Sequence, residues 1–319
     1  MKHPTSSFPA PTAGPGWWRL LSVICVALAL GACFPLRPMH RPVATLDLSV
    51  PSAAEMVESP GSGAGGEGPC AVVFLPGAFD RPATFEREGF DHILAERSPQ
   101  VRSLAVDLHL RYYIRGKALR RLDEDVVTPL RQEGYRVWLV GISMGGMGAA
   151  LYASQVPGYV APTEGGPDRT LAPARPEATG TPEGEVAGMV LMAPFLGDDE
   201  IIEAVDAAGG PLRWQPENAP AGRRGRGTVG YALWPWFARW HEARQAGEDG
   251  WPEVVLAYGR ADDFAPAGEQ LASLLDEERV FTHPAGHDWD AWTPLWREIV
   301  ASGIFDACGP PPGGGAGPA

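Results

Sequence analysis

Short apolar runs recur along the chain from residue 71 onward, and longer segments of mixed apolar and polar residues separate them. Continuous apolar runs rich in valine and leucine are typical of parallel strands that are buried on both faces. The predicted strands cover residues 71–75, 101–106, 135–140, 186–192, 254–258 and 280–281. The amphipathic segments between them predict helices over residues 83–97, 118–133, 145–155, 268–278 and 289–304. This alternation predicts an α/β fold, with a mostly parallel central sheet and helices on both faces.

Three segments fall outside this alternation. Residues 33–69 are rich in proline and glycine and are predicted to form a flexible tether, in which residues 43–48 alternate like one edge strand. Residues 157–185 contain few apolar side chains and predict a solvated or disordered loop, and the Gly/Pro-rich tail 309–319 is predicted to be disordered. The folded domain is therefore predicted to span residues 70–308.

Residues 198–250 separate two of the predicted strands and are rich in aromatic side chains. These are Trp214, Tyr231, Trp234, Trp236, Phe237 and Trp240. One interpretation of the insertion is a lid that lines a substrate pocket. The other is a cap helix that packs on the core.

The first 32 residues have the pattern of an export signal. Lys2 and Arg19 are basic, and residues 20–30 form an apolar run too short to span a bilayer. The run ends in Leu-Gly-Ala-Cys at Cys33, which resembles the lipobox of bacterial lipoproteins. The resemblance implies cleavage of residues 1–32 and a lipid anchor on Cys33. An ordinary signal peptide and a retained anchor are the alternatives.

Acidic residues outnumber basic ones by 39 to 26, so the chain carries a net charge of −13. Nucleic-acid binding depends on clustered Lys and Arg, and this balance argues against it. One local basic cluster lies in the aromatic insertion, and it is interpreted either as a contact for an anionic substrate or as a solvated loop. Its members are Arg213, Arg223, Arg224 and Arg226.

The strongest chemical signal is the G-x-S-x-G motif at residues 141–145. A predicted strand leads directly into it, and a helix start rich in small residues follows it. A strand that turns at once into a helix forces the central Ser143 into a strained, exposed position, which is typical of a catalytic nucleophile. A plain Gly-rich turn is the alternative.

At this motif the chain resembles the α/β-hydrolase superfamily, and the resemblance extends over most of residues 70–305. It implies the chain order Ser, acid, His, with a lid inserted between strands 6 and 7 of that family's sheet, here residues 198–250. The segment Gly-Arg-Ala-Asp-Asp-Phe-Ala-Pro at residues 259–266 looks like the family's G-x-x-D-x-x-V-P turn. The match assigns the acid to Asp262, with Asp263 as the alternative.

The base is assigned to His287, which follows the last predicted strand and a glycine. The stretch from Gly286 to Trp292 resembles the G-H-D-W-x-x-W ending of esterase D-like hydrolases and acyltransferases. Asp288 fits a helix N-cap better than a catalytic residue, because Asp is a preferred cap. His283 lies four residues earlier, too close to the strand to reach the site.

A tetrahedral intermediate requires backbone N–H donors directed at its oxyanion. The resemblance assigns one donor to Met144 and the other to the loop after residues 71–75. Pro76-Gly77 stands there in place of the family's usual His-Gly, which assigns the second donor to Ala78, with Phe79 as the alternative.

Four cysteines are present, of which Cys25 would leave with the signal peptide and Cys33 would carry lipid. Cys70 and Cys308 would remain in an oxidising compartment, either bridged or as free thiols. In the sheet that the resemblance implies, both lie at the edge opposite the site, so a disulfide between them is feasible.

The sequence predicts neither a metal nor a cofactor, because no metal-ligand spacing, dinucleotide fingerprint or phosphate-binding lysine motif is present. His109 and Tyr112 follow a predicted strand at its carboxyl end, where ligands bind in such sheets, and are weak candidates for the pocket.

Carboxylester hydrolysis is the predicted activity, by analogy with the superfamily. The predicted partners are a small-molecule or lipid ester and, through the lipid anchor, a membrane. Two alternatives stay open: an acyltransferase that uses the same triad with a hydroxyl acceptor, and a non-catalytic surface-binding lipoprotein. The sequence predicts no oligomeric state.

Overall fold

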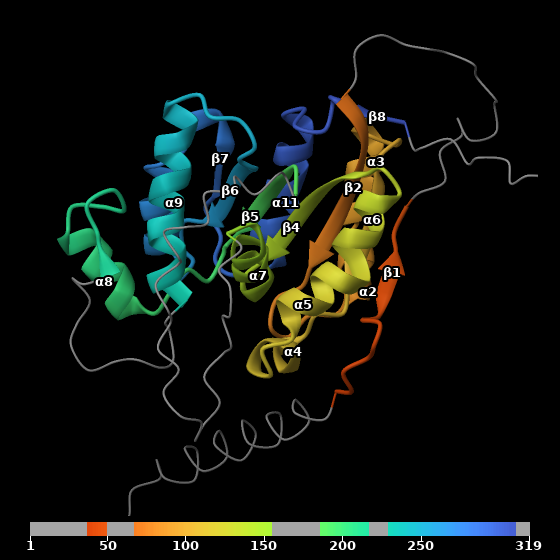
Figure 1. Cartoon of the computed structure of the whole chain (residues 1–319), viewed down its shortest axis with the longest axis horizontal. Helices are drawn as coiled ribbons and strands as arrows, with labels where there is room; N and C mark the ends of the chain where they lie inside the picture. The colour runs from red at the N-terminus through yellow and green to blue at the C-terminus, as the bar shows by residue number, and fades with distance from the viewer. Residues whose placement is uncertain (1–36, 50–66, 155–185, 217–228, 311–319) are drawn as a thin grey trace, which may run out of the picture. The chain divides into compact units, whose positions relative to one another are not determined.

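The computed structural model describes residues 37–49, 67–154, 186–216 and 229–310 (Figure 1). The chain divides into two compact units, Met1–Met39 and His40–Ala319, and all of the described helices and strands belong to the second. The predicted signal peptide, Cys33 and the predicted loop 157–185 lie outside the described residues. No helix in the described part of the chain is long and apolar enough to cross a membrane.

A single sheet organises the domain, with the strand order β1-β3-β2-β4-β5-β6-β7. These strands are Thr45–Asp47, Glu67–Leu75, Arg102–Val106, Arg136–Ile142, Gly188–Met192, Glu253–Gly259 and Val280–His283 for β1 to β7 in chain order. Strand β1 pairs antiparallel with β3 at one edge, and the other neighbours pair parallel. The predicted α/β architecture and the predicted edge strand are confirmed.

Helices pack against both faces of the sheet, because the strands are apolar on both sides. They are α2 Pro82–Arg87, α3 Phe90–Arg97, α4 Leu110–Ile114, α5 Ala118–Leu122, α6 Thr128–Gln132, α7 Met144–Ala153, α8 Asp199–Ala207, α9 Val229–Gln245, α10 Ala265–Ala272 and α11 Trp289–Ala301. In Figure 1, α5, α6 and α7 lie in front of the sheet and α3 and α11 lie behind it. Alternate strand residues such as Val72, Phe74 and Val140 form one core with α2, α3 and α11.

Several element boundaries differ from the sequence predictions, three of them in ways that reshape the elements. The helix predicted over residues 83–97 is broken at Gly89, whose φ of 73° is left-handed and separates α2 from α3. The helix predicted over residues 268–278 runs instead from Ala265 to Ala272. Strand β2 begins at Glu67, inside the predicted tether, because its first residues pair with the short strand β8 at Cys308–Gly309.

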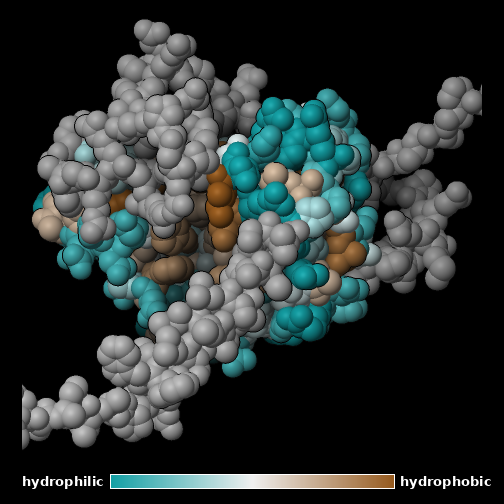
Figure 2. Space-filling model, turned by 90° about the horizontal axis from the view of Figure 1, so that it is seen from below, coloured by the Kyte–Doolittle hydropathy of each residue, from teal (hydrophilic) through white to brown (hydrophobic). Residues whose placement is uncertain are grey.

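A disulfide joins Cys70 to Cys308, with the two Cα atoms 5.3 Å apart. Cys70 lies near the start of β2, so the bond holds the end of the domain against the amino edge of the sheet. The site described below lies at the carboxyl edge, where β2 and β4 end. Figure 2 views this lower side of Figure 1, where hydrophobic residues gather in the middle of the face.

Candidate active site

Ser143 occupies the sharp turn between β4 and α7. Its φ of 54° and ψ of −114° are unusual for a residue with a side chain. Three backbone hydrogen bonds hold the turn. The Ser143 N–H donates to the Met192 carbonyl at 2.8 Å, and the Ser143 carbonyl accepts from the N–H groups of Met147 at 3.1 Å and Phe195 at 3.2 Å. The surrounding strand and helix therefore stabilise a conformation that would be unfavourable alone.

The glycines on either side of Ser143 are required by close backbone contacts. A Cβ on Gly141 would lie 2.2 Å from the Gly145 carbonyl oxygen, and a Cβ on Gly145 would lie 2.0 Å from the carbonyl oxygen of Leu75. No side chain fits at either position. The second contact brings α7 directly against the end of β2, where the predicted oxyanion loop begins.

Asp262 and His287 are hydrogen-bonded to each other. The Asp262 Oδ2 to His287 Nδ1 distance is 2.7 Å, and the Asp262 side chain has no exposed surface. The other carboxylate oxygen accepts the Phe264 N–H at 2.7 Å. Because an ionised carboxylate only accepts hydrogen bonds, His287 Nδ1 is the donor and its Nε2 is the basic nitrogen.

Aromatic rings fix the orientation of the His287 imidazole. It makes edge-to-face contacts with Phe264, at 4.9 Å between ring centroids, and with Trp292, at 5.0 Å. The next residue, Asp288, caps α11 by accepting the Ala291 N–H at 3.3 Å. The predicted N-cap role of Asp288 is confirmed.

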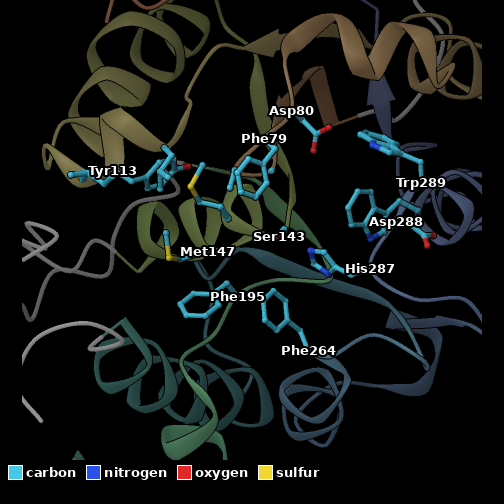
Figure 3. A pocket seen from close by; sticks show the side chains of 16 residues that line it. Phe79, Asp80, Tyr113, Ser143, Met147, Phe195, Phe264, His287, Asp288 and Trp289 are labelled. Carbon is cyan, nitrogen blue, oxygen red and sulfur yellow. The ribbon is translucent and has the colours of Figure 1, made fainter. Parts of the chain in front are cut away.

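Ser143 and His287 line the same cavity, which has a volume of about 680 Å³ (Figure 3). Most of its wall is apolar, formed by residues such as Tyr113, Met147 and Phe195. In Figure 3, Ser143 lies at the centre, between His287 on one side and Met147 and Tyr113 on the other. The cavity therefore places an apolar compartment directly beside the serine.

Sequence comparison places this site in a known family. The pattern of the alpha/beta hydrolase family matches residues 72–305. The chain belongs to the alpha/beta hydrolase family. No curated protein matches its sequence.

Among solved structures, the chain is similar at low identity to hydrolases. FphF, a fluorophosphonate-binding serine hydrolase from Staphylococcus aureus, is 13% identical, with a TM-score of 0.48 over 81% of this chain and 96% of that one. An esterase from Pyrobaculum calidifontis is 18% identical, with a TM-score of 0.46 over 87% of this chain and 89% of that one.

The three candidate oxyanion residues, Ala78, Phe79 and Met144, all line the cavity. A Cβ on Gly77 would lie 3.8 Å from the Ser143 Cβ, so the loop after β2 lies against the nucleophile turn. The Phe79 side chain is 80% exposed at the cavity.

Other candidates from the sequence lie outside the cavity. Asp263 is exposed, whereas Asp262 is buried against His287. His283 ends β7, where its Nδ1 accepts the N–H of Ala285 at 3.2 Å. Arg213 is exposed away from the cavity lining, and the other three arginines of its cluster lie outside the described residues.

The prediction for His109 and Tyr112 is wrong. Both are buried and pack edge to face, and the Tyr112 hydroxyl hydrogen-bonds the backbone of His40. The neighbouring Tyr113 lines the cavity instead. Both tyrosines belong to α4, where consecutive side chains point about 100° apart, so only one of them faces the site.

The aromatic insertion supplies none of the cavity-lining residues in the described part of the chain. Trp214, Trp234 and Phe237 are fully buried, and the Trp240 indole donates to the Pro252 carbonyl at 2.9 Å. These contacts favour the cap that packs on the core. The lid stays a prediction, since residues 217–228 of the insertion lie outside the described residues.

Asp80 is a cavity residue whose role the sequence did not predict. It lines the cavity and accepts a hydrogen bond from the Trp289 side chain. Burial raises its pKa above the usual value, and the hydrogen bond from Trp289 and the positive charge of Arg87 oppose that shift only in part. The contact with Trp289 joins the loop after β2 to the start of α11, two residues after His287.

No group of three or more His, Cys, Asp or Glu side chains is placed to hold a metal ion among the described residues. The polar groups of the site belong to a serine, a histidine and carboxylates, which are the groups of acid–base and nucleophilic chemistry.

Proposed function

We propose that the protein is a serine hydrolase that cleaves a carboxylic ester. The observation that carries this proposal is the hydrogen bond of 2.7 Å between the buried Asp262 and His287, which lines the same cavity as Ser143 in its strained turn. A serine hydroxyl becomes nucleophilic when a base accepts its proton, and the base works best when a third group orients it.

The reaction begins when the Ser143 Oγ attacks the ester carbonyl carbon and His287 Nε2 accepts the hydroxyl proton. The carbonyl oxygen becomes an oxyanion, which the N–H groups of Met144 and Ala78, or Phe79 in its place, stabilise. The carbonyl then re-forms, the alcohol leaves with the proton from His287, and the acyl group stays on Ser143. Water then attacks the acyl group while His287 Nε2 accepts its proton. The acid is released, and the proton passes from His287 to the Ser143 oxygen.

Asp262 has two effects in this mechanism. Its hydrogen bond keeps the proton on His287 Nδ1, so that Nε2 faces the serine as a base. Its negative charge also stabilises the imidazolium that forms in each transition state. Because the Asp262 side chain has no exposed surface, water screens this charge weakly.

The test is hydrolysis of p-nitrophenyl esters of increasing acyl length by the full chain in detergent, beside Ser143→Ala. We expect the variant to lose at least about 10⁴-fold in kcat. Equal rates for the two folded proteins, or no hydrolysis by either, would contradict the proposal and favour a non-catalytic surface-binding protein. An added alcohol that diverts the acyl group from free acid to a new ester would identify an acyltransferase.

We also propose that the protein is exported and anchored to a bacterial membrane by a lipid on Cys33. The support is the sequence of residues 1–33, which lie outside the described residues. Intact mass of the protein purified from its membrane would show the lipid, and an unmodified, uncleaved chain would contradict the proposal.

A further inference from the structure

The cavity extends from Ser143 along a wall that two helices build. Figure 3 shows Ser143 between His287 on one side and Met147 and Tyr113 on the other. Helices α4 and α7 supply five of the residues that line the cavity, and none of the five is charged. They are Leu110, Tyr113, Ile114, Met144 and Met147. This α4–α7 wall therefore offers a ligand mostly apolar surface and no charge.

Tyr113 stands between the cavity and a second, smaller one. It lines both, and the smaller cavity has a volume of about 20 Å³. The other residues around the smaller cavity belong to the turn between α4 and α5, to α5 and to α7. They are Gly116, Ala118, Leu119 and Leu151. The Tyr113 side chain is thus a partition between space that reaches Ser143 and space that does not.

Packing holds the Tyr113 side chain in this position. A Cβ on Gly148 would lie 2.1 Å from the Tyr113 hydroxyl oxygen, so the hydroxyl packs directly on the backbone of α7. Tyr113 is only 6% exposed, and burial raises the pKa of its hydroxyl, so the phenol stays neutral. The adjacent Tyr112 fixes α4 through hydrogen bonds of its hydroxyl with the backbone of His40, at 2.6 and 3.1 Å. The partition is therefore in place before a ligand binds.

The position of His287 assigns the α4–α7 wall to the acyl group of an ester. In serine hydrolysis the base gives its proton to the departing alcohol, so the alcohol lies on the side of the imidazole. The acyl group stays on Ser143 and extends along the opposite side of the cavity. In Figure 3 that side is the one of Met147 and Tyr113.

We propose that the acyl group of the substrate is an uncharged hydrocarbon chain, and that Tyr113 sets the longest chain that the site accepts. This inference rests on the proposed esterase function and specifies its substrate class. Each methylene that moves from water to an apolar wall raises affinity about fourfold. The gain ends where the chain meets the Tyr113 ring, because the ring closes off the space beyond it.

The test is the dependence of hydrolysis on acyl length, measured with the full chain in cholate, a detergent that has no alkyl chain to compete for the cavity. The substrates are p-nitrophenyl esters of the even-numbered acids from acetate to laurate. We expect kcat/KM to rise about tenfold with each step of the series up to a break, and to level off or fall beyond it. Tyr113→Ala joins the two cavities, so the break should move at least one step further along the series.

Two controls separate the partition from other effects. Tyr113→Phe keeps the ring and removes only the hydroxyl, so the break should stay where it is. Leu119→Ala enlarges the smaller cavity without opening it toward Ser143, and it should also leave the break in place. Tyr113→Leu, which fills more of the core than alanine, replaces Tyr113→Ala if the alanine variant does not fold. Because the readout is the position of the break, a general loss of activity in a variant cancels.

Two outcomes would overturn the inference while the hydrolysis itself still supports the proposed function. The first is a profile without a break, or a break that neither Tyr113→Ala nor Tyr113→Leu moves. The second is a break that Leu119→Ala or Tyr113→Phe moves as far as Tyr113→Ala does, because the ring would then not be the limit.

Binding of 1-alkanols tests the α4–α7 wall by itself if no ester is cleaved, a result that would contradict the proposed function. Tryptophan fluorescence follows the binding, because Trp289 and Trp292 line the cavity. Comparing the proteins at each chain length cancels the partition of the alkanol into micelles. We expect Tyr113→Ala to bind alkanols beyond the break at least about tenfold more tightly than the unmodified protein, and Tyr113→Phe to bind them equally. Equal affinities in all three proteins would overturn the inference independently of catalysis.

Discussion

Two carboxylates lie near His287, and their surroundings differ. Asp262, in the loop after β6, has no exposed surface and uses both oxygens inside the protein, one on His287 and one on the Phe264 N–H. Asp80, in the loop after β2, is half-buried, accepts from the neutral Trp289 indole and faces the cavity. The same residue type therefore has a different partner in each loop, an imidazole for Asp262 and an indole for Asp80.

The largest effect that tests this comparison is expected at Asp262. Asp262→Asn should lower kcat by about 10⁴-fold, because an amide no longer holds the His287 tautomer or stabilises the imidazolium. Steady-state kinetics on p-nitrophenyl esters measure this loss. A kcat equal to that of the unmodified protein would contradict the role proposed for Asp262.

A smaller effect is expected in the pH dependence of stability. Because burial raises the pKa of Asp80 in the folded protein, the folded state holds its proton more tightly than the unfolded state. Ionisation of Asp80 therefore destabilises the fold as pH rises through that pKa, and stability returns as pH falls below the usual value of 3.8.

Thermal unfolding of Asp80→Asn measures this effect. The Tm of the variant relative to the unmodified protein should be higher at pH 7 than at pH 3.5, by about one to three degrees. The exposed control Asp249→Asn should show no such trend. A Tm difference that is constant with pH would contradict the assigned burial of the Asp80 charge.

The residues of the proposed triad could be predicted because each has a local signal. Ser143 follows a strand and lies between Gly141 and Gly145, where close backbone contacts leave no room for a side chain. Asp262 and His287 each follow another strand at its carboxyl end. In a parallel sheet these ends meet at one edge, so the local signals also predict a common site. Strand position, chain order and the resemblance to the α/β-hydrolase superfamily together predicted them.

The contact between Asp80 and Trp289 could not be predicted, because it depends on packing between distant segments. Asp80 stands in a loop whose sequence shows nothing of Trp289, and only the fold brings the two side chains together. Tyr113 was missed for a related reason. Helix α4 was not predicted. Unless the orientation of this helix about its own axis is known, the sequence does not show which of its two adjacent tyrosines faces the cavity.

The breaks in secondary structure also depend on contacts between segments that are distant in the sequence. Gly89 lies within a pattern that fits one continuous helix, and a glycine inside such a pattern either stays helical or ends the helix. In the folded protein Gly89 adopts the left-handed conformation, and α3 starts at Phe90, which packs in the aromatic core. The early start of β2 likewise depends on β8, which comes from the far end of the domain.

The most direct test of the account is covalent labelling of the serine. The full chain in detergent is treated with a fluorophosphonate probe, and its intact mass is measured beside that of Ser143→Ala. The account predicts a single adduct on the unmodified protein and none on the variant, because His287 and Asp262 activate Ser143 alone. An unlabelled folded protein, or equal labelling of both proteins, would contradict it.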